Sequence, residues 1–151
     1  AIILLYAGWR WVPIIQSAIF PYLGGKWKGT VNYKDASGND ASKPVEMEVK
    51  HTLFGIKFLL ESDESSSQTV SVYAEKNLDF DKFHIYYIYN NHRKEGLEGS
   101  EKTYLGLVSS RLDLNGGNYS TLNGDYFTDT HRIGQIHLKF TEKNPFWKLW
   151  R

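Results

Sequence analysis

The side chains with the clearest capacity for chemistry are tyrosines and arginines near the ends of predicted strands. Arg111 and Arg132 are isolated basic residues, and Thr128 offers a hydroxyl group close to Arg132 in sequence. Aromatic rings stack on bases, and guanidinium groups pair with phosphates. The combination therefore suits an anionic ligand that carries bases. The tyrosines that could supply stacking surfaces are Tyr86, Tyr87, Tyr89 and Tyr104.

Catalytic chemistry has much weaker support in the sequence. There is no G-x-S-x-G nucleophile motif, no cysteine and no G-x-x-x-x-G-K phosphate loop. None of the five histidines is four residues from another, which leaves open only a three-histidine metal site assembled across strands. We therefore predict that the protein is not an enzyme and has no catalytic residue, metal or cofactor.

Charge and composition limit the partners further. The 151 residues include 18 basic and 17 acidic groups, a net charge of +1. Such a chain has no overall electrostatic attraction to DNA or RNA, so charge-driven binding must come from a local pocket. Apolar residues make up 41% of the chain, which is typical of one globular domain. The absence of cysteine fits a reducing compartment.

The candidate residues belong to strands, because apolar residues recur with a period of two from Trp27 onwards. Polar loops join these segments, and no helical period lies between them. The pattern predicts an all-β fold, a small antiparallel up-and-down β-barrel of about eight strands, with a β-sandwich as the alternative. The predicted strands are Trp27–Lys34, Val45–His51, Phe54–Leu60, Val70–Ala74, Phe83–Asn90, Thr103–Ser109, Thr121–Asp129 and Gly134–Thr141.

The first 23 residues differ from the rest, since Ala1–Leu23 is almost wholly apolar and carries one charge, Arg10. We expect an N-terminal hydrophobic helix here, the end of a transmembrane segment. A helix lying on the membrane and a helix packed on the barrel are the alternatives. Lysines directly after the segment favour a cytoplasmic location for the barrel. We therefore divide the chain into a hydrophobic helix and linker (1–23), a ligand-sensing barrel (24–143) and an aromatic tail (144–151).

Several short motifs occur in an order that resembles a known family. They are G-K-W-K-G-T-V (Gly25–Val31), Y-I-Y-N (Tyr87–Asn90), Y-L-G (Tyr104–Gly106), L-N-G-D-Y-F-T-D (Leu122–Asp129) and R-I-G-Q-I (Arg132–Ile136). With the apolar segment before them, they resemble the membrane-anchored, β-strand-rich effectors of bacterial cyclic-oligonucleotide anti-phage signalling (CBASS).

The resemblance implies a β-barrel that senses a cyclic dinucleotide and is attached to two transmembrane helices. It places the protein in the bacterial inner membrane, with the barrel on the cytoplasmic side and no DNA or RNA as partner. It also implies that the ligand promotes self-association of the effector, disruption of the membrane and death of the infected cell.

On these grounds we predict a binding site for a cyclic dinucleotide inside the barrel. Two other interpretations stay open at this stage. A lipocalin-like barrel for a small apolar ligand would have a wholly apolar interior, and a membrane-anchored partner-binding domain would have a filled barrel without a pocket. The predicted ligand-binding residues are Tyr87, Tyr89, Arg111, Tyr126, Thr128 and Arg132.

Overall fold

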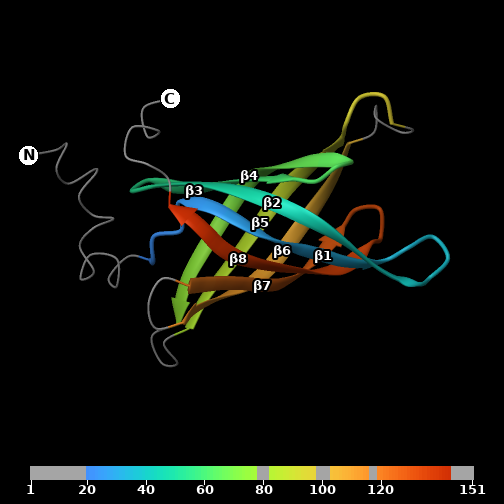
Figure 1. Ribbon diagram of the computed structural model, residues 1–151. Helices are drawn as coiled ribbons and strands as arrows, with labels where there is room; N and C mark the ends of the chain where they lie inside the picture. Colours follow the sequence, from blue (N-terminus) through green and yellow to red (C-terminus); the bar gives the residue numbers. More distant parts are fainter. Residues whose placement is uncertain (1–19, 78–81, 98–102, 116–118, 144–151) are drawn as a thin grey trace, which may run out of the picture.

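A computed structural model describes residues 20–77, 82–97, 103–115 and 119–143. Their eight strands form one closed antiparallel barrel, in which each strand pairs with its neighbours in sequence and β8 returns to β1 (Figure 1). The prediction of an all-β, up-and-down barrel is thus confirmed. The strands are β1 (Gly25–Lys34), β2 (Asp40–Thr52), β3 (Gly55–Glu61), β4 (Ser65–Asn77), β5 (Lys82–Arg93), β6 (Thr103–Asn115), β7 (Tyr119–Thr128) and β8 (Ile133–Lys143).

The predicted N-terminal helix falls mainly on residues 1–19, which lie outside the described ranges. In the part of the chain that the structure describes, no helix is long and apolar enough to cross a membrane.

Two polar segments are turns in their first part only. The predicted turn Asp35–Lys43 ends at Asn39, because β2 begins at Asp40 and pairs with β1 from there. The predicted loop Ser62–Ser67 ends at Glu64, because β4 begins at Ser65. In both cases the strands extend past the apolar core, because backbone pairing continues where the side chains have become polar.

Side chains alternate between the interior and the outer wall, as the strand period requires. In β2, Val45, Met47 and Val49 are buried, while Glu46 and Lys50 are exposed. Gly29 of β1 allows β8 to approach closely, since a Cβ atom there would lie 1.8 Å from the backbone oxygen of His137. The barrel therefore closes around a single apolar core.

One end of the barrel is plugged by the segment that precedes β1. Phe20 and Leu23 are buried, and the ring of Phe20 meets that of Phe83 edge-on at 5.4 Å. The indole Nε1 of Trp27 donates a hydrogen bond to the backbone oxygen of Leu23 (3.0 Å), and the Leu23 amide donates to Nδ1 of His51 (3.0 Å). The polar groups of Leu23, Trp27 and His51 are thus paired with one another at this closed end.

The pairing of β3 with β4 is the shortest in the barrel, with three residue pairs: Leu59 with Gln68, Leu60 with Ser67, and Glu61 with Ser66. Beyond these pairs, a side chain replaces the backbone as the hydrogen-bond partner of β3. The Thr69 hydroxyl accepts a hydrogen bond from the Phe58 amide (2.7 Å) and donates one to the Phe58 carbonyl (3.0 Å). A β-bulge in β4 follows between Thr69 and Ser71, and it turns Val70 outward, where 60% of its surface is exposed.

The two ends of the barrel have different roles in the architecture. Gly25 and Lys143 are paired at the closed end, so the chain enters and leaves the barrel there (Figure 1). The β1–β2, β3–β4, β5–β6 and β7–β8 connections all lie at the opposite end, which we call the mouth.

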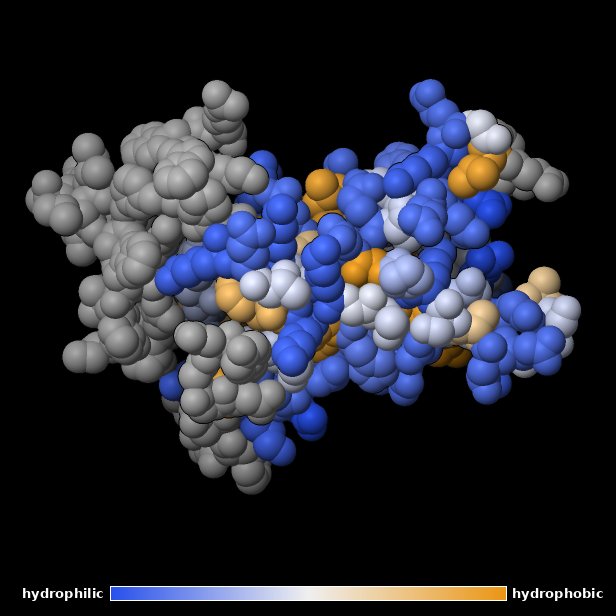
Figure 2. Space-filling view, viewed as in Figure 1, coloured by the Kyte–Doolittle hydropathy of each residue, from blue (hydrophilic) through white to orange (hydrophobic). Residues whose placement is uncertain are grey.

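The outer wall is mostly polar. Figure 2 shows a largely hydrophilic face on which hydrophobic residues form small groups. Lys28 of β1 pairs with Glu46 of β2 on this wall, and both side chains are more than half exposed. An exception runs across four strands, where the cross-strand neighbours Ile88, Leu107, Phe127 and Ile133 are each at least 40% exposed.

Candidate functional site

A cavity of about 120 Å³ lies inside the barrel near the mouth. Its lining changes in character along the barrel axis, from aliphatic side chains and one phenyl ring at mid-barrel to tyrosines and charged groups near the mouth. The apolar members are Val31, Val45, Phe58, Leu60, Val108 and Ile136. The tyrosines are Tyr33, Tyr87, Tyr89, Tyr104 and Tyr126, and the polar members are Lys43, Ser62, Glu64, Ser65, Ser67, Thr69, Asn91, Thr128 and Arg132.

Tyr87 and Tyr89 of β5 form the central aromatic surface. They are two residues apart on one strand, so both point inward, and their ring centroids are 6.1 Å apart. Phe58 of β3 supports Tyr87 from the side, at 4.8 Å between centroids. Gly106 of β6 pairs with Tyr89 and leaves room for its ring, because a Cβ atom there would lie 2.2 Å from that ring.

Four of the five tyrosines that line the cavity have a raised pKa and are therefore neutral at physiological pH. Burial raises the pKa of Tyr87 and of Tyr89. Burial also raises the pKa of Tyr104 and of Tyr126, and the positive charge of Arg132 opposes the increase in both. Each ring therefore combines a stacking face with a hydroxyl that can donate or accept a hydrogen bond.

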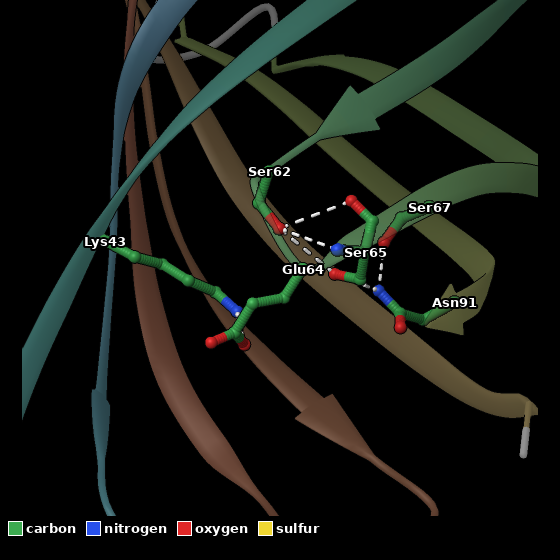
Figure 3. Close-up of polar contacts among 6 residues, drawn as sticks. All are labelled: Lys43, Ser62, Glu64, Ser65, Ser67 and Asn91. Atoms are coloured by element: carbon green, nitrogen blue, oxygen red, sulfur yellow. Dashed lines mark hydrogen bonds and ion pairs between the residues drawn. The ribbon is translucent and has the colours of Figure 1, made fainter. Parts of the chain in front are cut away.

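A buried amide forms the polar part of the wall beside these rings. Asn91 of β5 is 5% exposed, and its Nδ2 donates to the hydroxyl groups of Ser67 (2.6 Å) and Ser65 (3.2 Å), as Figure 3 shows. Ser65 also bonds to Ser62 across the β3–β4 turn. The amide is thus fixed in place next to the cavity, where its oxygen is suited to accept a hydrogen bond from a base.

Two cationic side chains border the mouth. Lys43 of β2 lies opposite Val31 of β1 and lines the cavity, and its ammonium group lies 5.5 Å from the centroid of the Tyr33 ring. Arg132 lies in the turn between β7 and β8, where its amide donates to the Thr128 hydroxyl (3.0 Å). β1 alone separates β8 from β2, and both Lys43 and Arg132 line the cavity. One ligand with two anionic groups could therefore meet both cations.

The structure brings five of the six predicted residues together, since Tyr87, Tyr89, Tyr126, Thr128 and Arg132 all line the cavity. Arg111 does not. Its neighbours Ser110 and Leu112 point inward and are buried, so Arg111 points to the outer wall. There its Nε lies 3.0 Å from Oδ1 of Asp113. The sequence prediction selected Arg111 by its charge and overlooked the alternation along β6.

Sequence reasoning missed Lys43, Glu64 and Asn91. The signal for two of them was present: Lys43 continues the inward series Val45, Met47 and Val49, and Asn91 continues Tyr87 and Tyr89. The predicted strands exclude both residues, because Lys43 falls between Trp27–Lys34 and Val45–His51, and Asn91 directly follows Phe83–Asn90. Glu64 lies in a turn, where no period indicates which way a side chain points.

Other kinds of site find less support. No group of three histidine, cysteine or acidic residues that could hold a metal occurs among the described residues. The wholly apolar interior expected for a lipocalin-like carrier is not what lines this cavity, which includes Lys43, Asn91 and Arg132.

The fold and the cavity define a small ligand-binding β-barrel with an aromatic, cationic mouth. Residues 18–140 match the family described as Cap15, cyclic dinucleotide receptor domain, and the chain belongs to that family. The resemblance to CBASS effectors is thereby confirmed, and with it the sensing of a cyclic dinucleotide. No curated protein matches the chain.

Proposed function

We propose that this protein is a non-enzymatic effector whose barrel binds a cyclic dinucleotide in the mouth cavity. Binding promotes self-association, and the assembled protein disrupts the bacterial inner membrane from the cytoplasmic side. The ligand lies against Tyr87, Tyr89 and Tyr126, with Thr128 at the rim, while Arg132 meets a phosphate.

The observation that carries this proposal is the joint presence of stacking rings and cations in one cavity. A cyclic dinucleotide has two bases and two phosphodiesters, so it needs both kinds of contact. Tyr87 and Tyr89 supply adjacent ring faces, and Lys43 and Arg132 supply positive charge at the mouth. Base stacking on an aromatic side chain contributes about 1–3 kcal/mol, and an arginine–phosphate pair is among the stronger hydrogen-bonded contacts.

Isothermal titration calorimetry tests the site directly. The probes are cyclic di-AMP, cyclic di-GMP, cyclic di-UMP and cyclic UMP–AMP, with a linear dinucleotide for comparison. We expect at least one cyclic probe to bind, and we expect Arg132→Ala and Tyr87→Ala each to weaken it by about tenfold or more. Arg111→Ala is the matched control, because it removes the same charge from the outer wall.

Two outcomes would contradict the proposal. One is the absence of binding by every cyclic probe. The other is a loss of affinity in Arg111→Ala that equals the loss in Arg132→Ala, since that would place the ligand outside the barrel.

Self-association has a candidate surface in the exposed apolar row of Ile88, Leu107, Phe127 and Ile133. Ile88 lies between Tyr87 and Tyr89, and Phe127 between Tyr126 and Thr128, so the same strands face the cavity and this row. Contiguous apolar surface of this kind marks interaction sites. Differential affinity of the ligand for the assembled state is what would shift the equilibrium.

The test of assembly is sedimentation velocity with and without the cyclic dinucleotide that binds. Leu107→Lys should abolish the ligand-induced species but should still bind the cyclic dinucleotide in calorimetry, with its affinity lowered only by the part that assembly contributes. Assembly that persists in this variant would place the interface elsewhere. Leakage of dye from vesicles of bacterial lipids by the membrane-attached protein tests the final step.

A further inference from the structure

The β3–β4 turn places a carboxylate at the mouth, directly beside a cation of the site. Figure 3 shows the side chains of Glu64 and Lys43 pointing toward one another, and Glu64 Oε2 lies 3.5 Å from Lys43 Nζ. Both residues line the cavity. A negative charge in this position is unexpected for a site that takes an anionic ligand, because like charges in contact oppose binding.

We propose that, in the barrel without ligand, the Glu64 carboxylate occupies the place beside Lys43 that a phosphate of the ligand would take. The carboxylate must then be displaced when the ligand binds. The inference rests on the proposed function and adds a regulatory residue to it. Glu64 thereby raises the ligand concentration that is needed for activation.

Lys43 does not depend on Glu64 for its position. It extends inward from β2, and its ammonium group is over the Tyr33 ring at 5.5 Å from the centroid. Cation–π contact of this kind holds an ammonium group without neutralising it. Lys43 therefore remains available to a phosphate after the carboxylate has moved away.

Glu64, in turn, is held at the mouth by its backbone. Its carbonyl oxygen accepts a hydrogen bond from the Lys94 amide (2.8 Å). The flanking Ser62 and Ser65 bond to each other through backbone and hydroxyl groups, and Ser65 is tied to Asn91. The side chain, which is 53% exposed, is the part that can swing out. The turn thus returns the carboxylate to Lys43 whenever the ligand leaves.

Arg132 differs from Lys43 in this respect. Among the described residues its guanidinium forms no ion pair. A ligand with two phosphodiesters can bind Arg132 with one of them and compete for Lys43 with the other. A ligand with a single phosphodiester can bind Arg132 and leave the Lys43–Glu64 pair intact, so only a ligand with two phosphodiesters has to break the pair in order to use both cations.

The test is a double-mutant cycle in calorimetry, using the cyclic dinucleotide that binds the unmodified protein best. Glu64→Gln should tighten binding by about twofold to fivefold, because an exposed ion pair no longer has to be broken. Lys43→Met should weaken binding, and Glu64→Gln should give little further gain in that background. Glu46→Gln is the matched control, since it removes the carboxylate from the Lys28 pair on the outer wall.

The result that overturns the inference is unchanged or weaker binding by Glu64→Gln. The inference is also overturned if Glu64→Gln increases affinity equally in the unmodified protein and in Lys43→Met. Glu64 would then repel the ligand directly and would not compete with it for Lys43. In either case binding by the unmodified protein keeps the proposed function intact. Failure of the proposed function is a separate result, in which no cyclic dinucleotide binds even the unmodified protein.

Discussion

Acid should destabilise this barrel through His51 more steeply than its carboxylates alone would. The imidazole lies at the closed end, 6% exposed and stacked on the Tyr22 ring at 5.5 Å with an interplanar angle of 4°. Its Nδ1 accepts the hydrogen bond from the Leu23 amide, so the ring is neutral there. Burial lowers the pKa of His51 from 6.5 to about 4.

The size and sign of the effect follow from linkage. The unfolded chain binds a proton at His51 below about pH 6.5, while the folded barrel does so only near pH 4. The stability that neutral His51 contributes is therefore fully present above pH 6.5, the pKa in the unfolded chain. It is lost as the pH drops from 6.5 toward 4. Protonation of His51 should lower the free energy of unfolding by about 2 kcal/mol at about pH 5, and by about 3 kcal/mol once the folded state is also protonated.

Urea unfolding followed by tryptophan fluorescence, from about pH 7 to about pH 5, measures this slope. His51→Phe keeps an aromatic ring beside Tyr22 but cannot titrate. The variant should be less stable near neutral pH by about 1–3 kcal/mol, because the Leu23 amide loses its acceptor. Its stability should nevertheless change with pH about 2 kcal/mol less than that of the unmodified protein. Parallel curves for the two proteins would refute a buried neutral histidine at this position.

Two further predictions concern the wall of the cavity. Thr69→Val should lower the free energy of unfolding by about 1–3 kcal/mol, because the Phe58 amide and carbonyl lose their partner. Hydrogen exchange should show faster exchange at the Phe58 amide, and an unchanged rate would contradict the role assigned to Thr69. Gly106→Ala should displace the Tyr89 ring and weaken cyclic dinucleotide binding by about tenfold or more in calorimetry. Gly55→Ala is its control, since a Cβ atom there meets nothing within 4 Å, and equal affinities in the two variants would show that Tyr89 does not contact the ligand.

The architecture could be predicted because strand alternation and barrel closure reinforce each other. Each of the eight segments has one apolar face, and burying all of these faces at once without leaving an edge requires a closed sheet. Strand ends were harder to predict. β2 extends back to Asp40 through polar residues, where backbone pairing and not side-chain burial decides the structure.

The site was predictable where its residues alternate and obscure where they do not. The inward positions of their strands are held by Tyr87, Tyr89 and Tyr126, which line the cavity. Arg111 occupies an outward position between two buried residues. Glu64 could not have been found in this way, because a turn has no period and its direction depends on hydrogen bonds between Ser62, Ser65 and Asn91. Charge and residue type alone therefore identify the kind of ligand better than they identify the contacts.

The pairing of Gly25 with Lys143 at the closed end has a mechanical consequence. Antiparallel ladders bond perpendicular to their strands, so a force that pulls these two residues apart acts along the hydrogen bonds. Such a load would unzip β1 from β8 one pair at a time, starting at the closed end. Tyr33, which pairs with Gly134 near the mouth, would be among the last to separate. Tension on Gly25 and Lys143 would thus open the plugged end first and leave the cavity at the mouth intact until most of the β1–β8 pairing had separated.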